Sequence, residues 1–139
     1  MGALLKPSEM FRAEIEPALA EYRADHLSER RAKYVARAID HHLDWTHAYY
    51  KSVDRSRVPH KLWDFRLEVF ERCPELRIMN DLSDAAHHRL LRVREKLPRL
   101  VATASDAFTV CTDELWIEGY GPFLPAANAA VEFWRKWRD

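Results

Sequence analysis

The chain has 139 residues, of which 47% are hydrophobic and 32% charged, with 22 basic and 22 acidic residues. This composition is typical of a globular chain of one-domain length and excludes an intrinsically disordered one, so we expect residues 1–139 to form a single helical domain. The formal net charge of zero argues against a dedicated DNA-binding protein, while leaving local basic patches open.

Targeting and redox signals are absent from the sequence. No segment is apolar enough for a signal peptide or for a membrane span of about 20 residues. Cys73 and Cys111 form no CxxC pair and are too few for a disulfide framework. We therefore expect a cytoplasmic protein with reduced thiols, without a Cys-rich zinc site and without membrane association.

Capping residues and prolines divide the first half of the chain into helices. Ser8 is expected to cap a short helix that runs to about Ile15, and Pro17 suits the first turn of a second helix. Ser28 is expected to cap the longest helix, which begins at Glu29 and ends at about Lys51.

Residues 52–59 are expected to form a loop, and residues 61–72 the next helix. Pro74 restricts the residue before it and opens a further helix. Apolar residues at every third or fourth position extend that helix to about Val93. The members of this core-facing stripe are Leu76, Met79, Leu82, Ala86, Leu90 and Val93.

The pattern changes near the C-terminal end. Two β-prone runs, 108–111 and 115–117, are separated by the polar residues 112–114 and predict a small hairpin. A closing helix is expected from Pro122 to about Trp137. One side of it carries Phe123, Ala127, Ala130, Val131, Trp134 and Trp137. The predicted fold class is mainly α: a helical bundle of about five to six helices with a short β-hairpin before the C-terminal helix.

Histidines and carboxylates cluster on the long helix. At about 100° per residue, His42 and Thr46 fall on its apolar side, whereas Asp40, Asp44 and His47 fall on the opposite side. We therefore expect the His42 side chain to be buried or half-buried.

A second cluster lies on the helix that begins at Pro74. Offsets of four, seven and eleven residues place Arg77, Asp81, Asp84 and His88 in one column, which can line a cleft. If His42 faces this column from the neighbouring helix, imidazoles and carboxylates converge as acid/base pairs and metal sites of helical bundles require. The candidate catalytic residues are His42, Arg77, Asp81, Asp84 and His88. The candidate ligands of a divalent metal are His42, Asp84 and His88.

Plainer interpretations compete with both clusters. A histidine among apolar neighbours is usually a core residue, and Asp–Arg or Asp–His pairs often only solvate a helix face. The sequence has no specific metal-ligand pattern, no Gly-rich phosphate loop, no GxSxG elbow and no HExxH helix. A basic strip likewise fits a solvated helix face, with nucleic-acid contact as the alternative. Its members are Arg30, Arg31, Lys33 and Arg37.

Several segments resemble a group of small, uncharacterised bacterial helical proteins with HLxDW and DLxNAxKH-like helices. The matching segments are His42-Leu43 followed by Asp44-Trp45, Cys73-Pro74-Glu75-Leu76, Asp81-Leu82-Ser83-Asp84-Ala85-Ala86-His87-His88, and Phe133-Trp134. The resemblance implies a helical fold with a short β segment before a closing helix. Asp84 stands where that pattern has Asn, and His87 where it has Lys.

The chain also has a distant likeness to HEPN domains, whose ribonucleases use an Arg followed four to six residues later by His. Here Arg77 precedes His87 and His88 by ten and eleven residues, so the nuclease motif is not matched.

Two functions are compatible with these observations. The first is a noncatalytic or regulatory module that self-associates into a homo-oligomer, because charge is balanced and aromatic residues are abundant without a complete catalytic motif. The alternative is a metal-dependent or HEPN-like acid/base enzyme that acts through the His/Asp cluster, with RNA as the substrate of the HEPN-like version.

Overall fold

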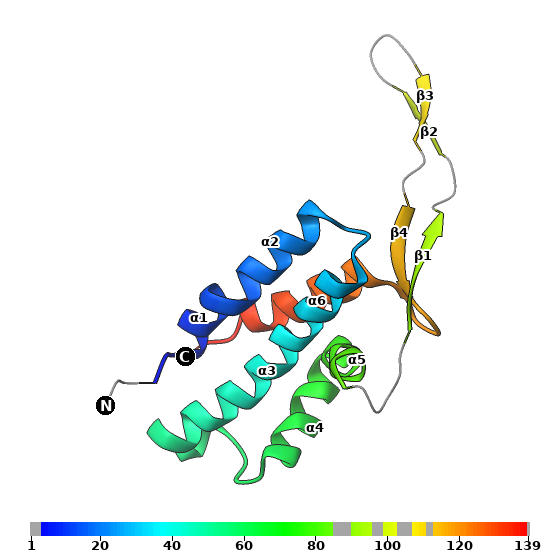
Figure 1. Ribbon diagram of the computed structural model, residues 1–139. Coiled ribbons are helices and arrows are strands. Elements are labelled where there is room, and N and C mark those ends of the chain that lie inside the picture. Colours follow the sequence, from blue (N-terminus) through cyan, green and yellow to red (C-terminus); the bar gives the residue numbers. More distant parts are fainter. Residues whose placement is uncertain (1–3, 85–89, 96–98, 103–106, 111–112, 139) are drawn as a thin grey trace.

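The computed structural model of the chain describes residues 4–84, 90–95, 99–102, 107–110 and 113–138. Helices pack around the long α3 (Glu29–Val53), and a narrow β-ribbon extends away from them (Figure 1). The predicted fold class is confirmed: the protein is mainly α, with β structure before the C-terminal helix.

The N-terminal helical segment has no break where two helices were predicted. The helix α1 (Pro7–Met10), a π-helical turn η1 (Phe11–Ile15) and α2 (Glu16–Ala24) follow one another directly. Pro17 lies in the first turn of α2, where its missing N–H does not interrupt the helix. The predicted cap at Ser8 is wrong, because Pro7 already starts α1 and Lys6 occupies the cap position.

The central helix α3 begins as predicted. Ser28 caps it, with Oγ accepting a hydrogen bond from the Arg31 N–H at 3.2 Å. The helix contacts α1, α2, η1, α4, α5 and α6, and its side chains at Val35, Ile39 and Leu43 are at most 1% exposed. Burying each such side chain contributes roughly 1.5–3 kcal/mol, so α3 is the main source of apolar burial in the fold.

A pair of shorter helices covers another side of α3. The predicted loop contains a 3-10 turn, η2 (Arg55–Arg57), and is followed by α4 (Leu62–Arg72). Pro74 opens α5 (Pro74–Ser83), and Cys73 between the two helices has extended backbone angles because a residue before proline avoids the helical region.

The prediction that α5 continues to about Val93 is wrong. The helix ends at Ser83, and Leu91–Glu95 forms the strand β1. Leu90 and Val93, predicted to face the core, are 50% and 48% exposed, and Ala86 of the same predicted stripe lies outside the described residues. In Leu91-Arg92-Val93-Arg94, apolar and charged residues alternate, so this segment satisfies the strand period as well as the helical stripe.

The β-prone runs form strands, but the predicted pairing between them is wrong. β4 (Asp113–Ile117) pairs antiparallel with β1, and β3 (Ala107–Val110) pairs with β2 (Arg99–Ala102). Both predicted runs therefore belong to the second half of a longer ribbon, and each pairs with a strand from the first half. Cys111, at the end of the first predicted run, lies outside the described residues.

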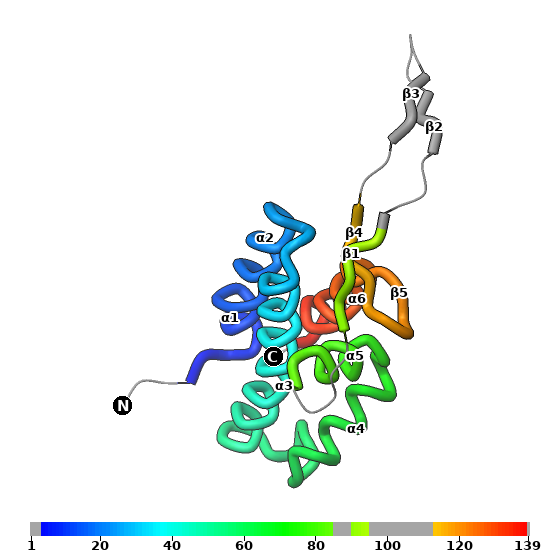
Figure 2. Tube along the Cα trace, turned by 45° about the vertical axis from the view of Figure 1, so that its right-hand side comes forward, coloured from blue at the N-terminus to red at the C-terminus, as the bar shows by residue number. Residues whose placement is uncertain are grey.

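The base of the ribbon is anchored to the helical body. β4 also pairs with the short β5 (Gly121–Pro122), and α6 (Phe123–Arg135) follows at once and contacts β4. Five of the six residues predicted for the inner face of the closing helix are buried: Phe123, Ala127, Ala130, Val131 and Trp134. The sixth, Trp137, lies beyond the end of α6 and is half-buried against the core. Figures 1 and 2 both show β1 and β4 leaving the helices beyond this anchor.

Candidate functional site

A polar network joins three helices on one side of α3. Arg66 of α4 donates from Nη1 to Asp40 Oδ1 (3.1 Å) and from Nη2 to Asp44 Oδ1 (2.6 Å). Asn80 of α5 donates from Nδ2 to the same Asp40 oxygen at 3.0 Å. The side chains of Arg66 and Asp40 are only 13% and 16% exposed, so this network fixes the positions of α4 and α5 against α3.

Beside the network lies a hollow of about 490 Å³, which we call the α4–α5 hollow. Its walls come from α3, α4, α5 and the residue after α5: Asp40, Trp63, Arg66, Leu67, Phe70, Arg77, Asn80, Asp81, Ser83 and Asp84. The predicted column of Arg77, Asp81 and Asp84 thus lies along one hollow, as the helical spacing indicated. Neither Asp81 nor Asp84 is without an interaction partner.

The two long walls of the hollow differ in chemistry. The α4 wall is partly apolar, with Trp63 62% exposed and Leu67 46% exposed. The α5 side carries carboxylates and a guanidinium group, which suit polar ligands and proton transfer. An amphipathic site of this kind can orient a ligand that has one flat apolar part and one polar part.

His42 is buried, as predicted, at 1% exposure. Its ring lies between Trp134 of α6 (centroid distance 4.7 Å) and Phe11 of η1 (6.3 Å), both edge to face. Asp40, two residues earlier on α3, faces the α4–α5 hollow instead, because two residues turn a helix by about 200°. His88, the proposed partner of His42, lies outside the described residues.

The position of His47, opposite the apolar side of α3, predicted an exposed side chain, and this prediction is wrong. It is 5% exposed, donates from Nε2 to the Pro59 carbonyl oxygen at 2.8 Å, and packs against the Phe65 ring at 5.5 Å. The segment after α3 and α4 fold back over this side of the helix. A central helix is covered from several directions, so one apolar stripe underestimates its buried surface.

Metal ligation has no complete ligand set in the described part of the chain. No group of three His, Cys, Asp or Glu side chains is arranged there to hold a metal ion. Of the three predicted ligands, His42 packs among aromatic rings and Asp84 borders the α4–α5 hollow.

The sequence prediction missed Arg66 and Asn80, which organise this side of the molecule. The available signal was the pair Asp40 and Asp44, one helical turn apart on the same side, which needs a cation from elsewhere. Arg66 was a candidate, because this cation stands between the apolar residues Phe65 and Leu67 in the next helix.

Cys73, at the junction of α4 and α5, is not an activated nucleophile. Burial raises the pKa of its thiol, and the nearby Glu75 carboxylate raises it further. The reactive thiolate is therefore scarce at neutral pH.

Known proteins give no guide to the function of this chain. No protein-family model matches the chain, and neither the curated proteins nor the solved structures gave a significant match. Among the described residues, no helix combines the length and apolar character needed to cross a membrane.

Proposed function

We propose that this protein is a noncatalytic helical module that self-associates through its β-ribbon. One observation supports this choice above the others: the same face of the ribbon is buried at its base and uncovered further out. Leu91, Leu115 and Ile117 are at most 5% exposed, whereas Val93 is 48% exposed. Residues two apart share a face of a strand, so Val93 continues the face that Leu91 begins.

A two-stranded ribbon with an exposed apolar face, as at Val93, is unfavourable in water. Such ribbons are marginally stable in water unless a third strand or a helix packs on one face. Beyond Val93, the paired strands β2 and β3 add the mainly apolar sequences Arg-Leu-Val-Ala and Ala-Phe-Thr-Val. A second copy that packs against this face buries apolar area, and two identical faces close into a two-fold dimer.

On the opposite face of β1 and β4, the charged side chains interact with one another and with Trp116. Arg92 and Glu118 lie 3.6 Å apart, and Arg94 lies across from Glu114 and over the Trp116 ring at 4.5 Å. Since these charges are compensated within the ribbon, this face has no need of a charged partner. The apolar face is the better candidate for contact with another copy.

Sedimentation equilibrium over a hundredfold range of protein concentration tests the proposal. We expect wild type to associate, Val93→Lys to weaken association by at least tenfold, and Arg92→Lys to leave it unchanged. The two variants place a lysine on opposite faces of the same strand, so Arg92→Lys controls for the substitution itself. A monomer at every concentration would refute self-association, and equal behaviour of the two variants would refute the role of this face.

A second candidate is an acid/base enzyme of the HEPN-like kind that acts on RNA. The observation in its favour is that Arg77, Asp81 and Asp84 line the α4–α5 hollow together. Incubating labelled RNA with the protein, with and without divalent metal, tests it. Cleavage that Asp81→Asn and His88→Ala both abolish would support this function. Intact RNA with wild type, under both conditions, would reject it.

A further inference from the structure

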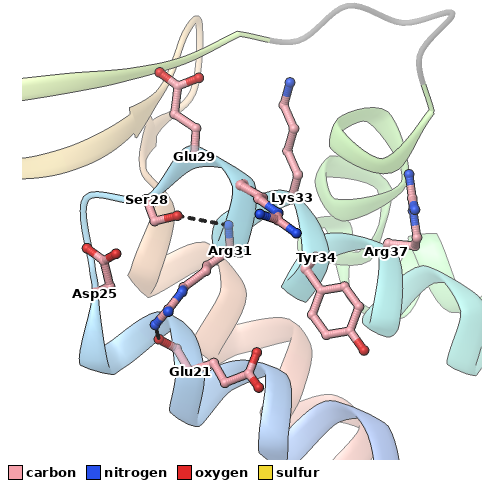
Figure 3. A pocket seen from close by; sticks show the side chains of 9 residues that line it. Glu21, Asp25, Ser28, Glu29, Arg31, Lys33, Tyr34 and Arg37 are labelled. Carbon is pink, nitrogen blue, oxygen red and sulfur yellow. Dashed lines mark hydrogen bonds between the residues drawn. The ribbon is translucent and has the colours of Figure 1, made fainter.

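A basic stripe runs along the first turns of α3. Arg30, Lys33 and Arg37 follow one another at three and four residues, so they lie on one side of the helix, and all three are exposed. Figure 3 shows Lys33 and Arg37 extending in the same direction from successive turns. Tyr34, within this stretch, is 52% exposed, and Figure 3 shows its ring leaving the helix in the opposite direction from Lys33 and Arg37, so a ligand that touches all three lies across the helix.

No described carboxylate is paired with the three cations of the stripe. Within the described residues, none of them forms an ion pair or a side-chain hydrogen bond. Most other arginines are engaged: Arg66, Arg92 and Arg135 pair with carboxylates, Arg57, Arg72 and Arg94 lie over aromatic rings, and Arg31 donates to the Glu21 carbonyl oxygen. Like charges one turn apart on a helix repel, and Glu29, one turn before Lys33, is a single negative charge against the three positive charges of the stripe.

The stripe borders a hollow of about 1200 Å³ between α2 and α3. Carboxylates also line it: Glu21 and Asp25 belong to the end of α2 and the turn after it, and Glu29 begins α3 (Figure 3). Glu21 and Asp25 repel an anionic ligand from the α2 side and Glu29 repels it from the start of α3, so the ligand is directed along Lys33 and Arg37.

We propose that this basic stripe, with Tyr34, binds single-stranded nucleic acid. From Arg30 to Arg37 the helix advances about 10 Å, which matches two or three phosphates of one strand. Unpaired bases stack on exposed aromatic rings, whereas the bases of a duplex are already stacked on each other, so the exposed Tyr34 favours a single strand. This inference is independent of self-association through the ribbon.

The test is fluorescence anisotropy with labelled twelve-residue oligouridylate and oligothymidylate at about 50 to 200 mM salt. Three phosphate contacts on a single strand predict a slope of log K against log salt of about −2. Replacing Arg30, Lys33 and Arg37 together by alanine should weaken binding by at least tenfold. Tyr34→Ala should weaken it roughly five- to hundredfold, and Tyr34→Phe should restore it, because stacking needs only the ring.

The matched control removes three cations from elsewhere on the surface. Arg12, Lys61 and Lys136 are also exposed, and their triple alanine variant should bind within about threefold of wild type. Both triple variants should melt no lower than wild type, since no described contact is lost. The proposal is overturned by absent wild-type binding at low salt, by equal losses in the two triple variants, by a duplex bound as tightly as the single strand, or by stronger capture on phosphatidylserine vesicles.

Discussion

Replacing Arg66 by methionine should loosen the joint between α3, α4 and α5. Methionine keeps most of the apolar stem but removes both bonds to Asp40 and Asp44. A hydrogen bond to a charged group contributes about 1.5–3 kcal/mol when shielded from water. That range applies to Asp40, whose side chain is 16% exposed, whereas the Asp44 side chain is 42% exposed and its bond contributes under about 1 kcal/mol.

We therefore expect Arg66→Met to lower the free energy of unfolding by about 2–3 kcal/mol, because Asn80 still donates to Asp40 and limits the loss. Asp44→Asn should lower it by under about 1 kcal/mol. Urea unfolding measures both, and with a slope of about 1–3 kcal/mol/M the Arg66 variant should shift the midpoint by roughly 1 M. A double-mutant cycle should give stronger coupling of Arg66 to Asp40 than to Asp44. Equal couplings, or an Arg66 variant as stable as wild type, would show that this network does not hold the helices together.

Three further predictions concern buried groups away from the α4–α5 hollow. His42→Ala should destabilise the protein by about 2–4 kcal/mol in urea unfolding, since the ring fills space between two aromatic side chains; an unchanged midpoint would argue against a packing role. Burial raises the pKa of Tyr22 to about 12, and unfolding returns it to about 10, so folding favours the protonated form. Stability is therefore complete below pH 10 and falls by roughly 2 kcal/mol as the pH rises to 12, and the urea midpoint of Tyr22→Phe should lack this part of the alkaline decline. In a Cys111→Ser background, Cys73 should react slowly with a disulfide reagent at pH 8, because its thiol is buried and the pKa of the thiol is raised. The reaction rate should rise steeply with denaturant, and fast reaction of the folded protein would contradict this.

Interactions between near neighbours in the chain were the predictable part of this fold. Ser28 predicted the start of α3, Pro74 predicted the start of α5, and the apolar spacing in α6 predicted its buried face. Caps, prolines and periodicity act within about one helical turn, so they are readable without knowledge of the rest of the molecule.

The candidate site was predictable only in part, for the same reason. The helical spacing placed Arg77, Asp81 and Asp84 along one hollow. It did not reveal that Asp40, rather than His42, faces that hollow from α3, because this depends on which side of α3 each neighbouring helix occupies. Arg66 was missed because its partners lie on another helix.

Local sequence signals were enough to predict a mainly helical chain, most helix starts and the burial of His42. Contacts between distant segments were needed to establish that Leu91–Glu95 is a strand, that the β-prone runs pair with earlier segments, and that His47 is covered. In Leu91–Glu95 the local preferences of helix and strand are nearly balanced, and pairing with β4 supplies the backbone hydrogen bonds and the burial of Leu91 that settle the balance. Where two local conformations are nearly equal in free energy, the partner strand decides between them, and that strand lies elsewhere in the chain.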